Sequence, residues 1–293
     1  MTIVRRSRVQ LRRAISVIGV AAALMASASG VSAFNFTTID VPGSNLTTAR
    51  GINKPGQIVG RYRDANGAVH GYLLDEGIFT TIDVPGAVYT RARGINNHSQ
   101  IVGYYRDAND QTHGFLLDQF IFTTIDVPGS TNTRPHYITG SGKIIGRYVD
   151  ANDVEHGFLL KDGVFTTIDF PGAIGTGAQA RRKGRIVGNY TDVNGAQHGF
   201  IRDKQGNFTT IDFPGATFTE VHSINSDLLI VGTYRVSGGP PHGFTLDQPN
   251  SIFTTVDVPG AASTELDGIN NKGLIVGAYR DTDGDLHGFL ATP

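Results

Sequence analysis

The 293-residue sequence contains no cysteine and no tryptophan, and only two methionines. Without cysteine there is no disulfide, so an exported form of the chain must be held together by its core. A single long apolar run occurs, near the N-terminus, and the lack of a second one argues against a membrane anchor. Beyond that run no window shows apolar residues at helical spacing, and 38 glycines would weaken any helix. The composition therefore favours strands.

The first 33 residues have the features of a secretory signal peptide. Five arginines lie before and at the start of an apolar run at about 14–26, and Val31-Ser32-Ala33 follows it. A basic region, an apolar segment too short to span a bilayer and a small-x-small end are typical of such signals. We expect cleavage after Ala33 and a secreted or periplasmic location. Two pairs of adjacent arginines leave twin-arginine export open beside ordinary secretion.

Removal of the signal changes the charge balance. Because it carries five arginines and no acidic residue, residues 34–293 hold 20 basic and 26 acidic residues, a net charge near −6. This argues against a nucleic-acid partner, which needs a basic face opposite the phosphates. The remaining 260 residues are long enough for one large domain, which we expect to be a monomer.

One unit is repeated along the whole of this domain. A Phe-Thr-Thr run recurs at an interval of 43 residues four times in succession, and the fifth interval is 45 residues. A period in this range indicates a repeat array in which each unit buries its apolar faces against its neighbours. The runs start at Phe36, Phe79, Phe122, Phe165, Phe208 and Phe253.

Each unit divides into four short segments separated by turn signals. In the first unit these segments are residues 50–53, 57–62, 69–74 and 78–83, rich in Ile, Val, Tyr, Phe and Thr. The break at Asp64-Ala65-Asn66-Gly67 is typical of a hairpin between antiparallel strands. A meander of four such strands repeated every 40 to 45 residues or so is the blade of a β-propeller.

We predict an all-β fold: a six-bladed β-propeller of about 43-residue, four-stranded repeats, covering residues 34–293. The segment 34–40 resembles an outermost strand with no blade before it, and 287–290 resembles a third strand with no fourth after it. We therefore expect the N-terminal strand to pair in the last blade and close the ring. The competing architecture is a solenoid, which would normally carry a different capping repeat at each end.

Three motifs of the second copy occur together: Gly94-Ile95-Asn96, Ile101-Val102-Gly103-x-Tyr105 and His113-Gly114-Phe115-Leu116. As a set they resemble the HAF family of probable extracellular repeats, named for a His-Ala-Phe motif. Here the middle residue is Gly in all six copies, and Tyr72 replaces Phe in the first. The resemblance implies a secreted bacterial tandem-repeat protein with no established activity, so it supplies no catalytic residues.

The histidine of this motif occurs once per unit and could suggest catalysis. In five units an aspartate lies six residues before it, as Asp64 does before His70. Because a site gathers its residues and a repeat distributes them, we favour a structural pairing. A second aspartate precedes Val-Pro-Gly or Phe-Pro-Gly in every unit, as at Asp83, and we expect it to accept backbone N–H groups of the next loop.

Two turns, 64–67 and 281–285, resemble calcium loops because oxygen-bearing side chains alternate in them. The twelfth residue counted from Asp281 is Thr292 rather than a glutamate, and the same residue types suit a tight hairpin turn. We expect turns, with no metal and no cofactor, although the sequence leaves a calcium ion open.

Positions that differ between copies are where a specific surface can form. A Thr recurs in every unit, from Thr47 to Thr264, whereas the next residue and the third residue after it vary. In a propeller both positions would lie at the start of the innermost strand and face the top opening of the channel. We predict a polar ring there, basic on one side and acidic opposite, that binds a small molecule or glycan. Its residues are Arg50, Arg91, Arg93, Arg134, His136, Gln179, Glu220, His222, Glu265 and Asp267.

The sequence therefore predicts a secreted, non-catalytic binding or structural module with a ligand site at the channel mouth. A solvated mouth without a ligand is the alternative reading of the ring. The enzyme alternative is a lyase or hydrolase that uses His136 or His222 as its base, with Arg93 or Arg134 holding an anionic substrate such as a uronate.

Overall fold

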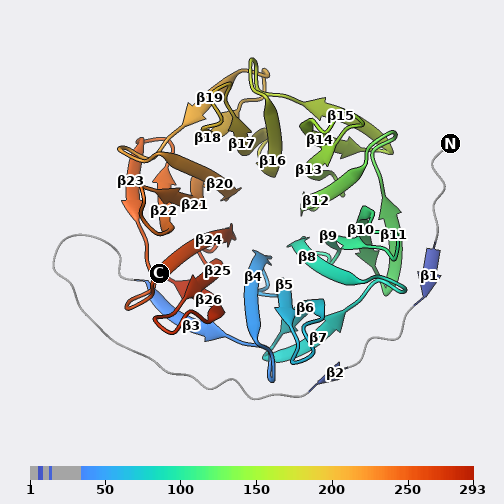
Figure 1. Cartoon of the computed structure of the whole chain (residues 1–293). Coiled ribbons are helices and arrows are strands. Elements are labelled where there is room, and N and C mark those ends of the chain that lie inside the picture. The colour runs from blue at the N-terminus through green and yellow to red at the C-terminus, as the bar shows by residue number, and fades with distance from the viewer. Residues whose placement is uncertain (1–5, 9–12, 15–33) are drawn as a thin grey trace.

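A computed structural model describes residues 6–8, 13–14 and 34–293, and within these ranges it contains strands and turns without a helix (Figure 1). The all-β prediction is confirmed. The predicted signal peptide lies almost entirely outside the described residues. Its two described pieces, β1 (Arg6–Arg8) and β2 (Arg13–Ala14), pair with β11 and β7. No helix long and apolar enough to cross a membrane is found in the described ranges.

The first unit folds into β4 (Leu46–Ile52), β5 (Ile58–Arg63), β6 (Val69–Asp75) and β7 (Ile78–Ile82). Each strand pairs antiparallel with the next, as the turn signals predict. Asp64 makes the turn between β5 and β6, because its Oδ1 accepts hydrogen bonds from the N–H groups of two following residues at 2.8 and 2.9 Å. The turn is therefore fixed by a local side chain.

The innermost strand begins at Leu46, four residues earlier than predicted. Thr47 and Ala49 are fully buried, which their polarity and small size did not indicate. Thr47 also has a bonding role, because its Oγ1 accepts a hydrogen bond from the backbone N–H of Val41 at 3.1 Å. The corresponding Thr makes the same bond in every other unit. This explains why this Thr alone stays unchanged beside variable neighbours.

The same pairing recurs along the chain. Single parallel bridges, Thr112 with Asn132 and Leu286 with Leu46, join some neighbouring sets into larger sheets. The next four sets are β8 (Tyr89–Ile95), β9 (Ile101–Arg106), β10 (Thr112–Asp118) and β11 (Ile121–Ile125); β12 (Asn132–Ile138), β13 (Ile144–Val149), β14 (Glu155–Lys161) and β15 (Val164–Ile168); β16 (Gly175–Arg182), β17 (Arg185–Thr191), β18 (Gln197–Arg202) and β19 (Phe208–Ile211); and β20 (Phe218–Ile224), β21 (Leu229–Arg235), β22 (His242–Asp247) and β23 (Ile252–Thr255).

The last set takes its outer strand from the other end of the domain. It consists of β24 (Ser263–Ile269), β25 (Ile275–Arg280), β26 (Leu286–Thr292) and β3 (Asn35–Ile39). β3 pairs antiparallel with β26 over five residues, and Phe36 packs edge-on against Phe289 with ring centroids 5.5 Å apart. The N-terminal strand therefore pairs where the sequence places it.

Figure 1 shows the sets arranged around a centre, with β4, β8, β12, β16, β20 and β24 innermost. Asparagines at the ends of inner strands link neighbouring sets: Asn53 Nδ2 donates to the Asn96 carbonyl at 3.0 Å, and Asn270 Nδ2 donates to the Asn53 carbonyl at 2.9 Å. The second bond joins the last set to the first.

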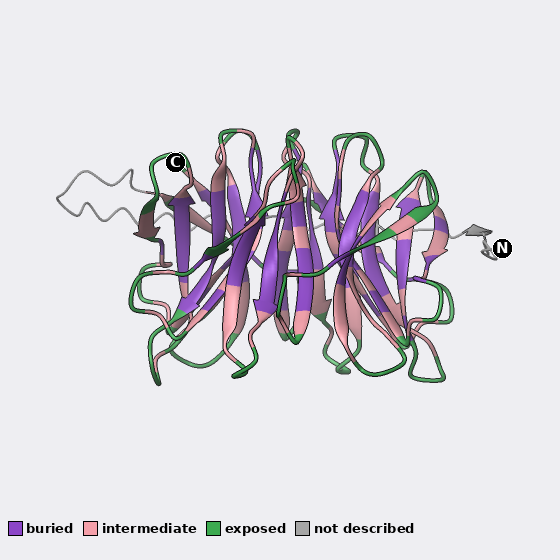
Figure 2. Cartoon of the chain, turned by 90° about the horizontal axis from the view of Figure 1, so that it is seen from above, coloured by how far each residue is buried: buried purple, intermediate pink, exposed green. Residues whose placement is uncertain are grey.

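The core lies between the sets, where the aromatic residue of each His-Gly-aromatic motif is completely buried. Tyr72 packs over Gly60 of the neighbouring strand, where a Cβ would lie 1.9 Å from the Thr48 carbonyl oxygen. Glycine is required there because backbone and ring approach so closely. Figure 2 shows this buried middle with exposed loops at both ends of the strands.

Candidate functional site

The third residue after the repeated Thr lies in a β-bulge in every inner strand. In β4 the register shifts between Ala49 and Gly51, which leaves Arg50 outside the hydrogen-bonded ladder. A bulge bends the strand and redirects the side chain of the extra residue. In the other five inner strands the corresponding shift leaves one residue outside the ladder: Arg93, His136, Gln179, His222 and Asp267.

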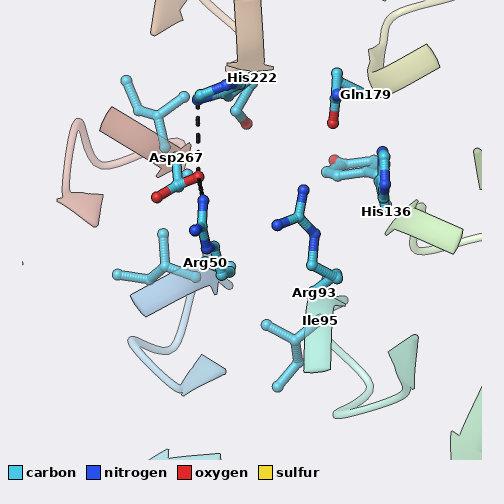
Figure 3. Close-up of a pocket in the computed structure, with 14 residues that line it drawn as sticks. Arg50, Arg93, Ile95, His136, Gln179, His222 and Asp267 are labelled. Atoms are coloured by element: carbon cyan, nitrogen blue, oxygen red, sulfur yellow. Dashed lines mark hydrogen bonds and ion pairs between the residues drawn. The ribbon is translucent and has the colours of Figure 1, made fainter. Parts of the chain in front are cut away.

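These six side chains converge on one cavity, of about 40 Å³ measured as the space open to the centre of a water molecule (Figure 3). Backbone and apolar atoms of the following residues complete its wall, including Ile52, Ile95 and Ile269. Since one water needs about 10 to 15 Å³ by this measure, the cavity has room for a few waters or one small polyatomic group.

The cavity lies deeper than the sequence predicts. Arg50 is the fifth of the seven residues of β4, and His136 is only 6% exposed, so the ring surrounds the channel within the strands. The prediction of a position at the strand start was wrong because β4 and its counterparts begin earlier than expected. The remaining predicted residues precede the cavity residues by two positions and do not line the cavity: Arg91, Arg134, Glu220 and Glu265.

The acidic side of the cavity is internally paired. Asp267 accepts a hydrogen bond from Arg50, because their strands β24 and β4 are neighbours (Figure 3). His222 donates from Nδ1 to the Leu266 carbonyl at 2.8 Å, and its Nε2 lies 3.3 Å from Glu220. Burial lowers the pKa of His222, but the Glu220 hydrogen bond and the charge of Asp267 outweigh burial and raise it. The predicted separation of basic and acidic sides therefore breaks down at Arg50.

The basic side of the cavity has unsatisfied groups. Neither ring nitrogen of His136 has a partner with hydrogen-bond geometry within the described residues, although both nitrogens are buried and the Ala178 backbone lies near the ring. Burial, followed by the charges of Arg93, Arg147 and Arg134, holds the pKa of His136 well below its ordinary value, while the Ala178 backbone opposes this. His136 is therefore a neutral imidazole at pH 7.

Arg93 lies beside His136 at the rim of the same cavity (Figure 3). Within the described part of the chain its guanidinium forms no ion pair with a carboxylate. Burial and the charge of Arg50 lower the pKa of Arg93 to about 10, so it stays a cation at neutral pH. The cavity therefore offers one unneutralised cation and one neutral imidazole, side by side.

A second group of polar residues lies two positions earlier on the inner strands. Arg91 donates a hydrogen bond of 3.1 Å to the Tyr104 hydroxyl, and the Arg134 guanidinium carbon lies 5.3 Å from the Tyr104 ring centroid. Burial raises the pKa of Tyr104, but the charges of Arg93, Arg91 and Arg134 outweigh it and lower that pKa to about 7.

Tyr104 was missed by the sequence analysis, although a signal existed. It follows the glycine of Ile101-Val102-Gly103, and the residue at this position varies between copies as the ring positions do. The structure pairs this position with the inner-strand residue next to the repeated Thr, as Tyr104 with Arg91. The equivalent residues are Arg61, Arg147, Asn189, Thr233 and Ala278.

The repeated histidines lie on the third strands, do not line this cavity, and contact aspartates. His70 donates from Nδ1 to Asp83 at 2.9 Å, whereas its Nε2 lies 3.7 Å from Asp64. The first contact recurs in all units and the second in five. The expected roles were therefore largely exchanged: Asp83 bonds the histidine, and Asp64 accepts the backbone N–H groups of the turn.

This arrangement supports the edge of each unit. Tyr62 stacks on His70 with ring centroids 5.0 Å apart, and its hydroxyl lies 2.9 Å from Thr81 Oγ1 on the outer strand. Asp281 accepts backbone N–H groups at 2.8 and 3.0 Å, which is turn geometry. Across the described residues no group of three or more His, Asp or Glu side chains is arranged to hold a metal ion.

No protein-family model matches this sequence, and no curated protein matches it either. Solved structures do match this chain. The Aleuria aurantia lectin in complex with Fucα1-6GlcNAc aligns over 84% of this chain and 93% of its own, with a TM-score of 0.53 and 13% identity. TolB from Acinetobacter baumannii aligns over 81% and 64%, with a TM-score of 0.59 and 15% identity. A gluconolactonase from Xanthomonas campestris aligns over 99% and 100%, with a TM-score of 0.51 and 12% identity. At these identities the likeness shows a propeller-like fold alone.

Proposed function

We propose that this chain is a secreted HAF-type repeat protein, a six-bladed β-propeller closed by β3, which binds a small anionic molecule or the anionic group of an acidic sugar in its central cavity. The contacts of β3 with β26 and of Asn270 with Asn53 support the closed ring. The lectin among the similar structures, solved with a fucosyl disaccharide, is compatible with a sugar ligand.

The observation that carries the binding proposal is the pair Arg93 and His136. A buried guanidinium without a carboxylate and a buried imidazole without a hydrogen bond are both costly, because each has lost its water. An anionic group in the cavity would accept hydrogen bonds from both side chains and remove that cost. Gln179, beside them in the cavity lining, could bond a neutral hydroxyl of the same ligand (Figure 3).

Titration calorimetry with acetate, glucuronate and phosphate tests this function. We expect at least one of these anions to bind, and Arg93→Ala to weaken that binding about tenfold to a hundredfold, the range of a lost charged hydrogen bond. Arg202→Ala is the matched control, because Arg202 lies on the third strand β18 and packs over Phe208 away from the cavity. Equal binding by both variants would reject the cavity as the site.

The neutral state of His136 specifically favours a second candidate, a lyase acting on uronate-containing substrates. A neutral imidazole can accept a proton, and Arg93 beside it could hold the carboxylate that acidifies the neighbouring carbon. His222 is less suited, because Glu220 and Leu266 already occupy its nitrogens. Formation of an unsaturated product from uronate oligosaccharides, lost in His136→Ala and kept in the control Arg202→Ala, would establish this activity. A chain that binds uronates without turnover is a binding module.

A further inference from the structure

We infer that the ligand whose anionic group enters the central cavity at Arg93 and His136 is an elongated dianion, with its second anionic group outside that cavity, at Arg91 and Arg134. This inference rests on the proposed function and specifies its ligand class. Three observations support it: the spacing along the strands between Arg93 and Arg91, the lack of carboxylate partners for Arg93, Arg91 and Arg134, and the position of Tyr104 beside these arginines.

The two anchoring groups lie one above the other along the channel. Arg91 and Arg93 project from the same face of β8. Ala92, which lies between them, and Thr90, which precedes Arg91, are buried on the opposite face. Arg134 and His136 repeat this spacing on the neighbouring strand β12. Two residues along a regular strand span about 7 Å, and the bulges at Arg93 and His136 bend this step, so anionic groups held at both levels would lie about 7 Å apart or less.

The level of Arg91 and Arg134 carries an excess of positive charge on their side of the ring, whereas Glu220 and Glu265 occupy the same level on the other side. Of its arginines Arg61, Arg91, Arg134 and Arg147, the structure pairs only Arg147 with a carboxylate, Glu155 at 2.9 Å, within the described residues. Arg134 donates instead to the neutral Asn132 at 3.0 Å, and Arg91 Nε is buried without a hydrogen bond. Burial and the charges of Arg50 and Arg91 lower the pKa of Arg61 to about 10, which reflects the crowding of like charges.

The low pKa of Tyr104 indicates that the arginines around it stabilise a negative charge at its hydroxyl oxygen. Its hydroxyl accepts a hydrogen bond from Arg91, and its pKa falls to about 7 because three arginines surround it. An oxygen of a ligand placed beside this hydroxyl would meet the same arginines. At the level of Arg93 and His136, the buried His136 nitrogens have no hydrogen-bond partner within the described residues, and Arg93 has no carboxylate. Arg93 is also the arginine that most lowers the pKa of Tyr104, so the two sets of donors lie close to each other.

A ligand with a single anionic group would satisfy one level and leave the other unpaired. A dianion of matching length gains charged hydrogen bonds at both, and the second group binds at a high effective concentration once the first is held. Adipate and pimelate carry carboxylates on flexible chains that can span the two levels, whereas malonate is too short. Acidic disaccharides and phosphorylated uronates share the same chemistry.

The test is titration calorimetry of the wild-type domain with acetate, malonate, succinate, adipate and pimelate at about pH 6, where Tyr104 is neutral. We expect adipate or pimelate to bind about tenfold or more tightly than acetate and malonate. Equal affinity for acetate and for every dicarboxylate, still abolished by Arg93→Ala, would overturn the dianion and leave the proposed function standing. The absence of any anion binding would overturn both.

Substitutions of the arginines test where the second anionic group of the ligand binds. Arg134→Gln should reduce the affinity for adipate about tenfold and the affinity for acetate by much less, whereas Arg93→Ala should weaken the binding of both strongly. Arg91→Gln provides an independent substitution at the same level, and thermal melting of each variant checks that it is folded. A preference for adipate that survives in both Arg134→Gln and Arg91→Gln would place the second group elsewhere and reject this assignment.

Discussion

Asp40 accepts a hydrogen bond of 2.9 Å from His287, although the two residues are 247 positions apart in the chain. Asp40 directly follows β3, and His287 lies on β26, so this contact accompanies the pairing of the first described strand of the domain with the last. The same bond occurs within each other unit, between residues 13 to 15 positions apart. The contact between the two ends of the domain is therefore the same as the histidine–aspartate contact inside each other unit.

Deletion of residues 34–41 tests the contribution of this interface. Full burial of Ile39 contributes roughly 1.5 to 3 kcal/mol, and Phe34 and Phe36, which are partly buried against Phe289 and its neighbours, each contribute less. Together they are a substantial part of the net stability of a typical domain, about 5 to 15 kcal/mol. We expect the shortened domain to unfold or dimerise, measured by thermal melting and gel filtration. A monomer with an unchanged melting temperature would contradict the closed ring.

The histidine of the same interface should make stability depend on pH. Burial lowers the pKa of His287, but its hydrogen bonds to Asp40 and Asp281 outweigh burial and raise it. Because the folded pKa lies above the unfolded one, the stabilisation is complete below about pH 6.5 and is lost as pH rises through the folded pKa.

Urea unfolding of the wild type and of His287→Gln at about pH 5.5 and about pH 9 measures this effect. We expect the difference in unfolding free energy between the two proteins to be larger at the lower pH. His98→Gln is the control, since His98 lies outside the repeated motif and is exposed. A difference that does not change with pH would assign His287 a packing role alone.

The pair Arg50 and Asp267 joins the first and last inner strands and is largely buried, with 16% and 4% of the side chains exposed. Asp267→Ala would leave the Arg50 charge unpaired, and we expect a loss of about 3 to 5 kcal/mol of unfolding free energy. The double variant Arg50→Met with Asp267→Leu should be more stable than Asp267→Ala, because it does not leave the buried Arg50 charge without its partner. Denaturant unfolding compares the three proteins, and a double variant weaker than the single one would refute this account.

Tyr104 should make anion binding depend on pH. Its phenol faces Arg91, Arg93 and Arg134, with Arg50 and Arg61 also close enough to interact. As pH rises through about 7 the phenol loses its proton, and the phenolate competes with the ligand for the arginines. Affinity for adipate should therefore fall between about pH 6 and pH 8.

Tyr104→Phe isolates this effect, because it removes the hydroxyl and keeps the ring beneath Arg134. Loss of charge from His222 as the pH rises also weakens anion binding, so the informative quantity is the difference between the two pH profiles. We expect a shallower fall in the variant. Identical profiles by calorimetry would mean that the phenol does not ionise near the ligand.

Much of the local structure was predictable from residues close together in sequence. The turn at Asp64 forms through bonds to residues two and four positions later, so its pattern alone identifies it. The Thr-x-x-variable pattern also identified the residues that surround the cavity. The start of β4 was misplaced, because Thr47 is buried by packing between sets and by its bond to Val41.

The sequence by itself determined the strands, the repeat and the variable positions, because hairpins and apolar periodicity depend on neighbours within one unit. Only the tertiary structure decided that Arg50, Arg93 and His136 lie in bulges facing one cavity, since a bulge depends on the register of two strands. It also decided that Tyr104 lies among arginines from neighbouring strands. Charge interactions depend on distance in space, and residues far apart along the chain meet here because the inner strands surround a common centre.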